Sequence, residues 1–210
     1  MLAKVAQWFN EGGVFMWVIL GVMGVALAVA VERLIYYGIV CRGNAVRLVA
    51  QLARLLNEDK VEEARQAVCC RRSPAYVLLR TAVERYAAGM KTEDLQEGVD
   101  EAAIKELPRM SERLNYLALF ANVATLLGLL GTISGLKNAF DSLVTVEAAK
   151  KAAALAAGIS EAMNTTAFGL IVAVPCMVLY TTLTNYKDRL VKDMDEAVVR
   201  LLNYLSKRRG

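Results

Sequence analysis

Three stretches of the chain lack charged residues and are long enough to cross a membrane: Gly12–Val31, Leu114–Leu136 and Ala162–Tyr186. A helix rises about 1.5 Å per residue and the hydrocarbon layer is about 30 Å thick, so each stretch fits one helical span. The second and third stretches also carry polar and small residues at helical spacing on one side. Polar side chains at membrane depth normally face a bundle interior or an aqueous cavity. The pattern predicts three transmembrane helices, two of which line a bundle interior or an aqueous cavity.

The first stretch has a second interpretation, a cleaved signal peptide, because Lys4 gives a basic start and Ala28–Ala30 resembles a cleavage site. Its apolar run exceeds the length of about 7–15 residues that is usual for a signal sequence. A retained span is therefore favoured.

The side chains on the polar faces leave two roles open. Threonine can bond to its own helix, and small residues let membrane helices pack closely, so packing and pore lining are both possible. For Gly128, Gly131, Gly135 and Gly169 we expect packing, and for Pro175 a bend in the third span. The candidate lining residues are Asn122, Thr125, Thr132, Thr165 and Thr166, and Gly169 continues the face of Thr166.

Two of these hydroxyls and one carboxylate mark the outer ends of the spans. Thr132 lies five residues before Lys137, and Thr166 lies five residues after Glu161. In an antiparallel hairpin both hydroxyls should therefore lie at a similar depth. Glu161 stands at the expected mouth, either as a functional carboxylate or as an interfacial one paired with Lys150 or Lys151.

The charged regions between the spans are predicted to be helical, and no alternating pattern predicts a strand. Leucines from Leu48 to Leu56 recur at helical spacing up to Asn57. A second helix is expected over Val61–Cys70, a third over Tyr76–Ala88 with Gly89 after it, and a fourth over Thr92–Leu107 with the Thr92 hydroxyl as its cap. Pro108 is expected to bend the junction with the second span, where the helical pattern resumes. The fold class is thus an all-α polytopic membrane protein.

The distribution of basic residues predicts the topology. Of the 25 Lys and Arg residues, 14 lie between Arg33 and Arg113 and seven lie from Lys187 onward. The positive-inside bias therefore places both regions in the cytoplasm and the N-terminus outside. The predicted segments are an interfacial N-terminal segment (1–11), three spans (12–35, 114–140 and 159–186), a cytoplasmic helical region (36–113), a periplasmic turn region (141–158) and a cytoplasmic C-terminal helix (187–210). The second and third spans are expected to continue beyond the bilayer, with the outer turn near Asp141–Glu147.

The composition argues against several classes of chemistry. The chain has no histidine, and its four cysteines do not have zinc-site spacing, so no metal, cofactor or disulfide is expected. No nucleophile–base arrangement or phosphate-binding glycine loop supports an enzyme. The net charge of +4 comes from interleaved acidic and basic residues, which does not single out nucleic acid. The spans carry no Asp, Glu, Lys, Arg or His at mid-membrane depth, so a proton path would need an acid from a partner helix.

Two motifs resemble the ExbB/TolQ branch of the MotA/TolQ/ExbB proton-channel family. The first runs over Leu126–Gly135 and continues with Asn138–Phe140. The second begins at Gly158–Ala162 and continues through Thr165–Ala167 to Pro175. Both motifs are long and occur in the family's order. Thr125 departs from the family, since many members have proline there, and the chain has room for only one span near its N-terminus, unlike the four-span flagellar branch.

The resemblance implies a homopentameric bundle in the bacterial inner membrane around a pore. It further implies an ExbD- or TolR-like one-span partner in that pore, usually in two copies, whose aspartate carries the proton, and a TonB- or TolA-like protein that spans the periplasm. Thr132, Thr166 and Glu161 match the family's functional positions. From a different class, the alternative is a passive membrane scaffold or assembly protein whose polar stripes only pack helices.

Overall fold

The computed structural model describes residues 9, 12–41, 45–69 and 73–209, and every regular element within them is helical. The prediction of an all-α chain is confirmed for these residues. The expected N-terminal interfacial segment lies outside them, apart from Phe9, and so does Cys70. The elements are α2 (Gly13–Ile35), the π-helix η1 (Tyr36–Val40), α3 (Ala45–Asn57), α4 (Val61–Cys69), α5 (Pro74–Ala87), α6 (Thr92–Ser111), α7 (Leu114–Thr145), the 3₁₀-helix η2 (Ala148–Lys150) and α8 (Lys151–Arg209).

Three helical segments are long and apolar enough to cross a membrane, and they contain α2, α7 and α8. These helices carry the three uncharged stretches of the sequence, so the predicted number of spans is confirmed. The chain divides into two compact units. We call Met1–Val31 with Arg113–Thr182 the apolar unit, and Glu32–Glu112 with Leu183–Gly210 the bundle unit.

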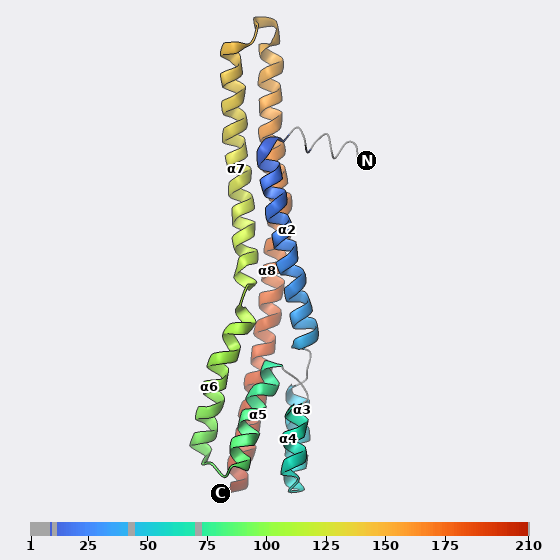
Figure 1. Cartoon of the computed structure of the whole chain (residues 1–210), viewed down its shortest axis with the longest axis vertical. Coiled ribbons are helices and arrows are strands. Elements are labelled where there is room, and N and C mark those ends of the chain that lie inside the picture. Colours follow the sequence, from blue (N-terminus) through green and yellow to red (C-terminus); the bar gives the residue numbers. More distant parts are fainter. Residues whose placement is uncertain (1–8, 10–11, 42–44, 70–72, 210) are drawn as a thin grey trace. The chain divides into compact units, whose positions relative to one another are not determined.

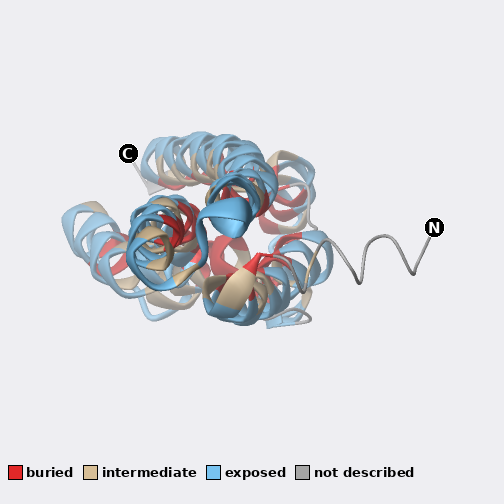
Figure 2. Cartoon of the chain, turned by 90° about the horizontal axis from the view of Figure 1, so that it is seen from above, coloured by how far each residue is buried: buried red, intermediate tan, exposed pale blue. Residues whose placement is uncertain are grey.

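In the apolar unit, α7 and the first half of α8 form an antiparallel hairpin, and α2 packs along it (Figure 1). Figure 2 shows that the helices are buried on one side and exposed on the other. The buried cluster draws side chains from all three helices. Its members are Met16, Ile19, Ala26, Ala121, Ala124, Phe168, Val172, Ala173 and Cys176.

The bundle unit has a core of large aliphatic side chains. α5 packs between α4 and α6, and α3 packs on α4. The end of α8 is fastened to α3, since the Tyr204 hydroxyl donates to the Ala53 carbonyl at 3.1 Å and Arg208 binds the Leu56 carbonyl and the Asp59 carboxylate. Seven fully buried leucines form the centre: Leu52, Leu56, Leu78, Leu79, Leu95, Leu201 and Leu205.

The predicted end of α3 at Asn57 is confirmed. α5 runs from Pro74 to Ala87 rather than over Tyr76–Ala88, and Gly89 beyond it has the positive φ of 79° that suits glycine after a helix. The start of α6 was predicted with the wrong cap. Its N-cap is Lys91, whose backbone N–H donates to the Asp94 carboxylate at 3.1 Å, and Thr92 is already helical. A carboxylate in the first turn therefore accepts the hydrogen bond at this end of the helix, in place of the expected hydroxyl.

The junction after α6 also differs from the prediction. Pro108 lies inside α6, which continues to Ser111, and the helix breaks at Glu112 and Arg113 instead. Arg113 has a left-handed φ of 61°, which ends the helical hydrogen-bond ladder. The helical pattern from Met110 onward does not by itself reveal this break.

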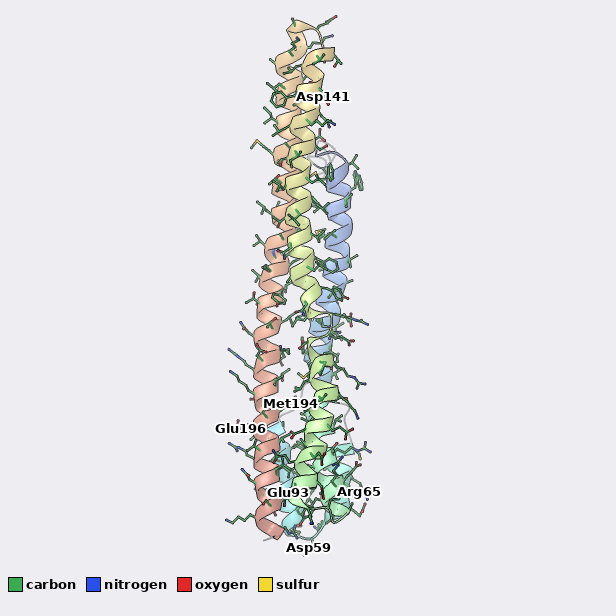
Figure 3. The ribbon with its side chains drawn as sticks, turned by 90° about the vertical axis from the view of Figure 1, so that its left-hand side faces the viewer. Asp59, Arg65, Glu93, Asp141, Met194 and Glu196 are labelled. Carbon is green, nitrogen blue, oxygen red and sulfur yellow. The ribbon has the colours of Figure 1, made fainter. Side chains whose placement is uncertain are left out.

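The hairpin turn is shorter than the predicted region 141–158. α7 continues to Thr145 and α8 begins at Lys151, so only 146–150 join the two helices. Figure 3 shows Asp141 on the part of the hairpin that extends beyond the first turn of α2. Alanine is the best helix former, which explains why the alanine-rich residues after 150 are helical.

Candidate functional site

The contact between α7 and α8 is a seam of small residues. On α7 the buried positions recur every three or four residues and include Gly128, Gly131 and Gly135. A Cβ atom added at Gly128 would lie 3.3 Å from the Thr166 Cα, and one added at Gly135 would lie 2.9 Å from the Ala162 backbone nitrogen. These backbones approach too closely for a larger residue, so the glycines serve the packing of the hairpin.

Gly169 and Gly158 provide the same close approach from α8. A Cβ added at Gly169 would lie 2.7 Å from the Ala124 carbonyl oxygen, and one added at Gly158 would lie 2.9 Å from the Gly135 carbonyl oxygen. Packing was expected for Gly169 from the sequence, whereas Gly158 was given no packing role there. Pro175 lies inside α8, which stays helical through it.

The hydroxyls of the four candidate threonines, Thr125, Thr132, Thr165 and Thr166, donate to backbone carbonyls. Thr166 reaches across the seam to the Gly128 carbonyl at 2.9 Å, whereas Thr132 bonds to Leu129 of its own helix at 2.6 Å. Thr125 bonds to the Ala121 carbonyl at 3.0 Å. Asn122 is exposed. The structure thus gives Thr166 an interhelical contact and leaves Thr125 and Thr132 with bonds inside α7.

Thr132 and Thr166 lie on the same side of the hairpin. Each follows a seam residue by one position, Gly131 on α7 and Thr165 on α8, and these two seam residues contact each other. One residue is a rotation of about 100°. Because the helices are antiparallel, that rotation turns both threonines toward the same face.

This threonine face, defined by Asn122, Thr125, Thr132 and Thr166, is not the face that α2 covers. Phe168 and Val172 belong to the buried cluster that includes the α2 residues Met16 and Ile19. They follow Thr166 by two and six positions, rotations of about 200° and about 240°, so they lie on the opposite side of α8 from Thr166. Thr132 and Thr166 are partly exposed. Within the described residues of the apolar unit, the threonine face is thus an open helix surface with hydroxyls on both helices.

Thr165 does not share this face. Its side chain is 1% exposed, and its hydroxyl lies 2.7 Å from the Gly12 carbonyl oxygen and 2.8 Å from the Glu161 carbonyl oxygen. The contact with Gly12 joins positions 153 residues apart, which no sequence pattern indicates. Thr165 therefore packs inside the protomer rather than on the surface where it was expected.

Glu161 lies on a polar groove near the outer end of the hairpin. The groove has a volume of about 670 Å³, and its polar lining comes from Asn138, Ser142, Ser160 and Glu161. Small residues such as Ala154 and Gly158 complete it. The suggested ion pair with Lys150 is wrong, because the Lys150 ammonium pairs with Glu147 at 3.4 Å. No ion pair joins Glu161 to another described residue.

In the part of the chain that the structure describes, no cluster of three His, Cys, Asp or Glu side chains could hold a metal ion. The geometry offers instead an open hydroxyl-bearing face, a carboxylate beside a polar groove at one end of it, and a seam that keeps two helices in register.

Comparison with known proteins shows the family of the chain. Residues 71–196 match the family described as the MotA/TolQ/ExbB proton channel family. The chain belongs to this family.

Its similar relatives carry the names ExbB and TolQ, which support the ExbB/TolQ branch. The chain is 28% identical over 195 residues to the biopolymer transport protein ExbB of Pseudomonas putida, covering 86% of this chain and 58% of that protein. It is 28% identical over 202 residues to a putative ExbB homologue of Methanothermobacter thermautotrophicus, covering 95% and 70%. It is 32% identical over 111 residues to the Tol-Pal system protein TolQ of Pseudomonas aeruginosa, covering 51% and 48%.

The chain therefore spans about three fifths of the length of the P. putida protein. The part of the chain that matches the family contains both helices of the hairpin up to Glu196. It includes the threonine face, Glu161 and the glycines of the seam.

Proposed function

We propose that this member of the ExbB/TolQ branch is a proton-channel and stator scaffold subunit of an inner-membrane motor that uses the proton motive force for work at the outer membrane. The observation that carries the proposal is the threonine face, which presents hydroxyls from two antiparallel helices on the side that α2 leaves uncovered. Hydroxyls on an open face at membrane depth favour contact with water or with a polar partner.

The proposal includes a partner helix, because the apolar parts of α2, α7 and α8 contain no Asp, Glu, Lys, Arg or His at mid-membrane depth. Proton transfer needs a titratable group or a chain of water molecules. An ExbD- or TolR-like protein with one span would supply that group as an aspartate, in two copies within the pore. A TonB- or TolA-like protein would then carry the motion across the periplasm.

In this proposal five copies of the chain surround the pore, with the threonine face of each hairpin turned inward. The spans are 12–35, 114–140 and 159–186, with 36–113 and 187–210 in the cytoplasm and the N-terminus in the periplasm. The excess of basic residues in the two proposed cytoplasmic regions supports this orientation. Mass measurement of the solubilised complex tests the assembly, and a stable monomer would contradict it.

Thr166→Val tests the role of the threonine face. It removes one hydroxyl but keeps the side-chain volume, so we expect the complex to assemble and its proton-driven function to fall. Thr181→Val is the matched control, because Thr181 lies on the same helix and bonds only to the Met177 carbonyl, at 3.0 Å. Undiminished proton flux in a reconstituted Thr166→Val complex would count against the proposed role.

A second candidate is a passive scaffold or assembly protein. It is favoured by the finding that the hydroxyls of Thr125, Thr132, Thr165 and Thr166 all donate to backbone carbonyls, which is sufficient for a packing role. Proton-flux measurements with and without a coexpressed one-span partner separate the two functions, because only the channel gains flux from the partner.

A further inference from the structure

The first turn of α2 lies directly against Glu161. Gly13, the first residue of α2, has a left-handed φ of 71°. A Cβ atom added at Gly13 would overlap Oε1 of Glu161 and would lie 3.1 Å from its Cδ. The carboxylate therefore occupies the space that a side chain at position 13 would need.

A hydrogen bond fastens the same turn to the helix that carries Glu161. The Thr165 hydroxyl reaches the Gly12 carbonyl oxygen at 2.7 Å and the Glu161 carbonyl oxygen at 2.8 Å. A Cβ added at Gly12 would overlap Sδ of Met16, a residue that is fully buried. Neither position of the glycine pair can therefore take a side chain without displacing its surroundings.

The position of the carboxylate also has an electrostatic reason. The first N–H groups of a helix have no partner within the helix, and they give this end a partial positive charge. Glu161 lies beside this end of α2 and forms no ion pair with another described residue. The start of α2 therefore places positive potential beside the carboxylate.

We propose that Gly12, Gly13 and Thr165 are positioning residues that hold the Glu161 carboxylate at the edge of the polar groove. Gly13 makes room for the carboxylate, Gly12 allows the close approach of Met16, and Thr165 links the turn to α8. This inference rests on the proposed function, in which Glu161 stands at the mouth of the proton path. It assigns a role to the glycine pair at the start of the first span that is separate from membrane crossing.

Carboxyl labelling of the whole chain in detergent or nanodiscs tests the inference without a proton measurement. A water-soluble carbodiimide and an amine modify accessible carboxylates, and mass spectrometry gives the extent of labelling at Glu161. We expect Gly13→Ala to increase labelling at Glu161 severalfold, because the added methyl group collides with the carboxylate. Glu147, which is exposed, is the internal reference and should be labelled equally in all variants.

Gly21→Ala and Gly24→Ala are the matched controls. They lie on the same helix, and an added Cβ would find no atom within 4 Å at either position. Labelling at Glu161 should stay at the wild-type level in both. An equal increase in these controls, or unchanged labelling in a folded Gly13→Ala protein, would overturn the proposal.

Thr165 provides a second test if Gly13→Ala does not fold. Thr165→Val should increase labelling at Glu161, and Thr165→Ser, which keeps the hydroxyl, should restore the wild-type level. Equal labelling in the two variants would contradict the positioning role. Proton flux through Glu161→Gln is measured separately, so undiminished flux would remove Glu161 from the proposed function while leaving the labelling result intact.

Discussion

The interiors of the two units consist of different kinds of side chain. The hairpin of the apolar unit meets along glycines and alanines, and Gly169 lies close enough to Gly128 for an added Cβ to come within 3.2 Å of the Gly128 Cα. The centre of the bundle unit consists of leucines such as Leu52 and Leu201, which are fully buried. Both units are helical, so the difference does not come from secondary structure.

The difference follows from the solvent on the outside of each unit. In water, burying a large aliphatic side chain is favourable because it removes apolar surface from the solvent. In a bilayer the lipid tails are as apolar as leucine, so helix association depends on close van der Waals packing and on hydrogen bonds. Small residues bring the backbones together, and hydroxyls such as that of Thr166 can then reach a carbonyl on the neighbouring helix.

The polar contacts differ in the same way. In the apolar unit they come from short side chains whose hydroxyls donate to nearby backbone carbonyls. In the bundle unit long side chains reach distant backbone groups, as Tyr37 donates to the Met110 carbonyl at 2.5 Å and Arg85 to the Asp94 carbonyl at 2.7 Å. The comparison predicts that the two units respond differently to substitutions that change volume.

The largest expected effect is loss of a leucine from the bundle unit. Leu52→Ala should lower the free energy of unfolding by about 2–5 kcal/mol, because it removes buried apolar surface and leaves a cavity. Pulse proteolysis in urea measures this for the full chain in detergent. Leu55→Ala on the same helix is the control, since Leu55 is only partly buried and should cost less. Equal losses of unfolding free energy in the two variants would show that stability does not follow the burial of these leucines.

A smaller effect is expected from an added methyl group in the seam of the apolar unit. Gly169→Ala should destabilise the hairpin by about 1–3 kcal/mol, because the new Cβ collides with backbone atoms that cannot rotate away. Unfolding in mixed micelles of SDS and detergent, followed by circular dichroism, measures the loss.

Gly21→Ala gives the contrasting result for the same chemical change. An added Cβ at Gly21 meets open space, and alanine favours a helix by about 1 kcal/mol over glycine, so this variant should be neutral or more stable. If both variants lost stability alike, close packing of the seam would not explain the result.

The smallest expected effect is loss of one hydroxyl at the end of α8. Tyr204→Phe removes the hydrogen bond to the Ala53 carbonyl and should cost about 1 kcal/mol in the bundle unit. Tyr186→Phe is the control, since its hydroxyl has no hydrogen-bond partner among the described residues. Greater protease sensitivity of α3 in Tyr204→Phe alone would support the contact, and identical sensitivity in both variants would argue against it.

Much of the architecture could be predicted from the sequence. The three uncharged stretches predicted the helices that are able to span a membrane, because length and apolarity are properties of a continuous segment. Helix ends that depend on one residue were also predictable, as with Gly89, which takes the left-handed conformation after α5. The expectation that Thr132 and Thr166 lie at a similar depth followed from their places in the spans and an antiparallel connection, whereas their shared face required the contact between Gly131 and Thr165.

Other features arose only from tertiary structure. The break between α6 and α7 lies at Arg113 rather than at Pro108, because the left-handed backbone at Arg113 ends the helical ladder while α6 accommodates Pro108. The N-terminus of α6 is capped by the Asp94 carboxylate, which accepts from the Lys91 backbone N–H, and this contact depends on the backbone geometry at Lys91. Neither the helix break nor the cap can be predicted from the periodicity of the residues.

The sequence by itself determined which segments are apolar enough to enter a membrane and which side of each helix is small or polar, since both are local properties of the chain. Only the tertiary structure decided that Thr165 turns inward to Gly12, 153 positions away, and that the Glu161 carboxylate takes the side-chain space of Gly13. These contacts depend on how three helices meet, and the spacing of residues along one helix does not contain that information.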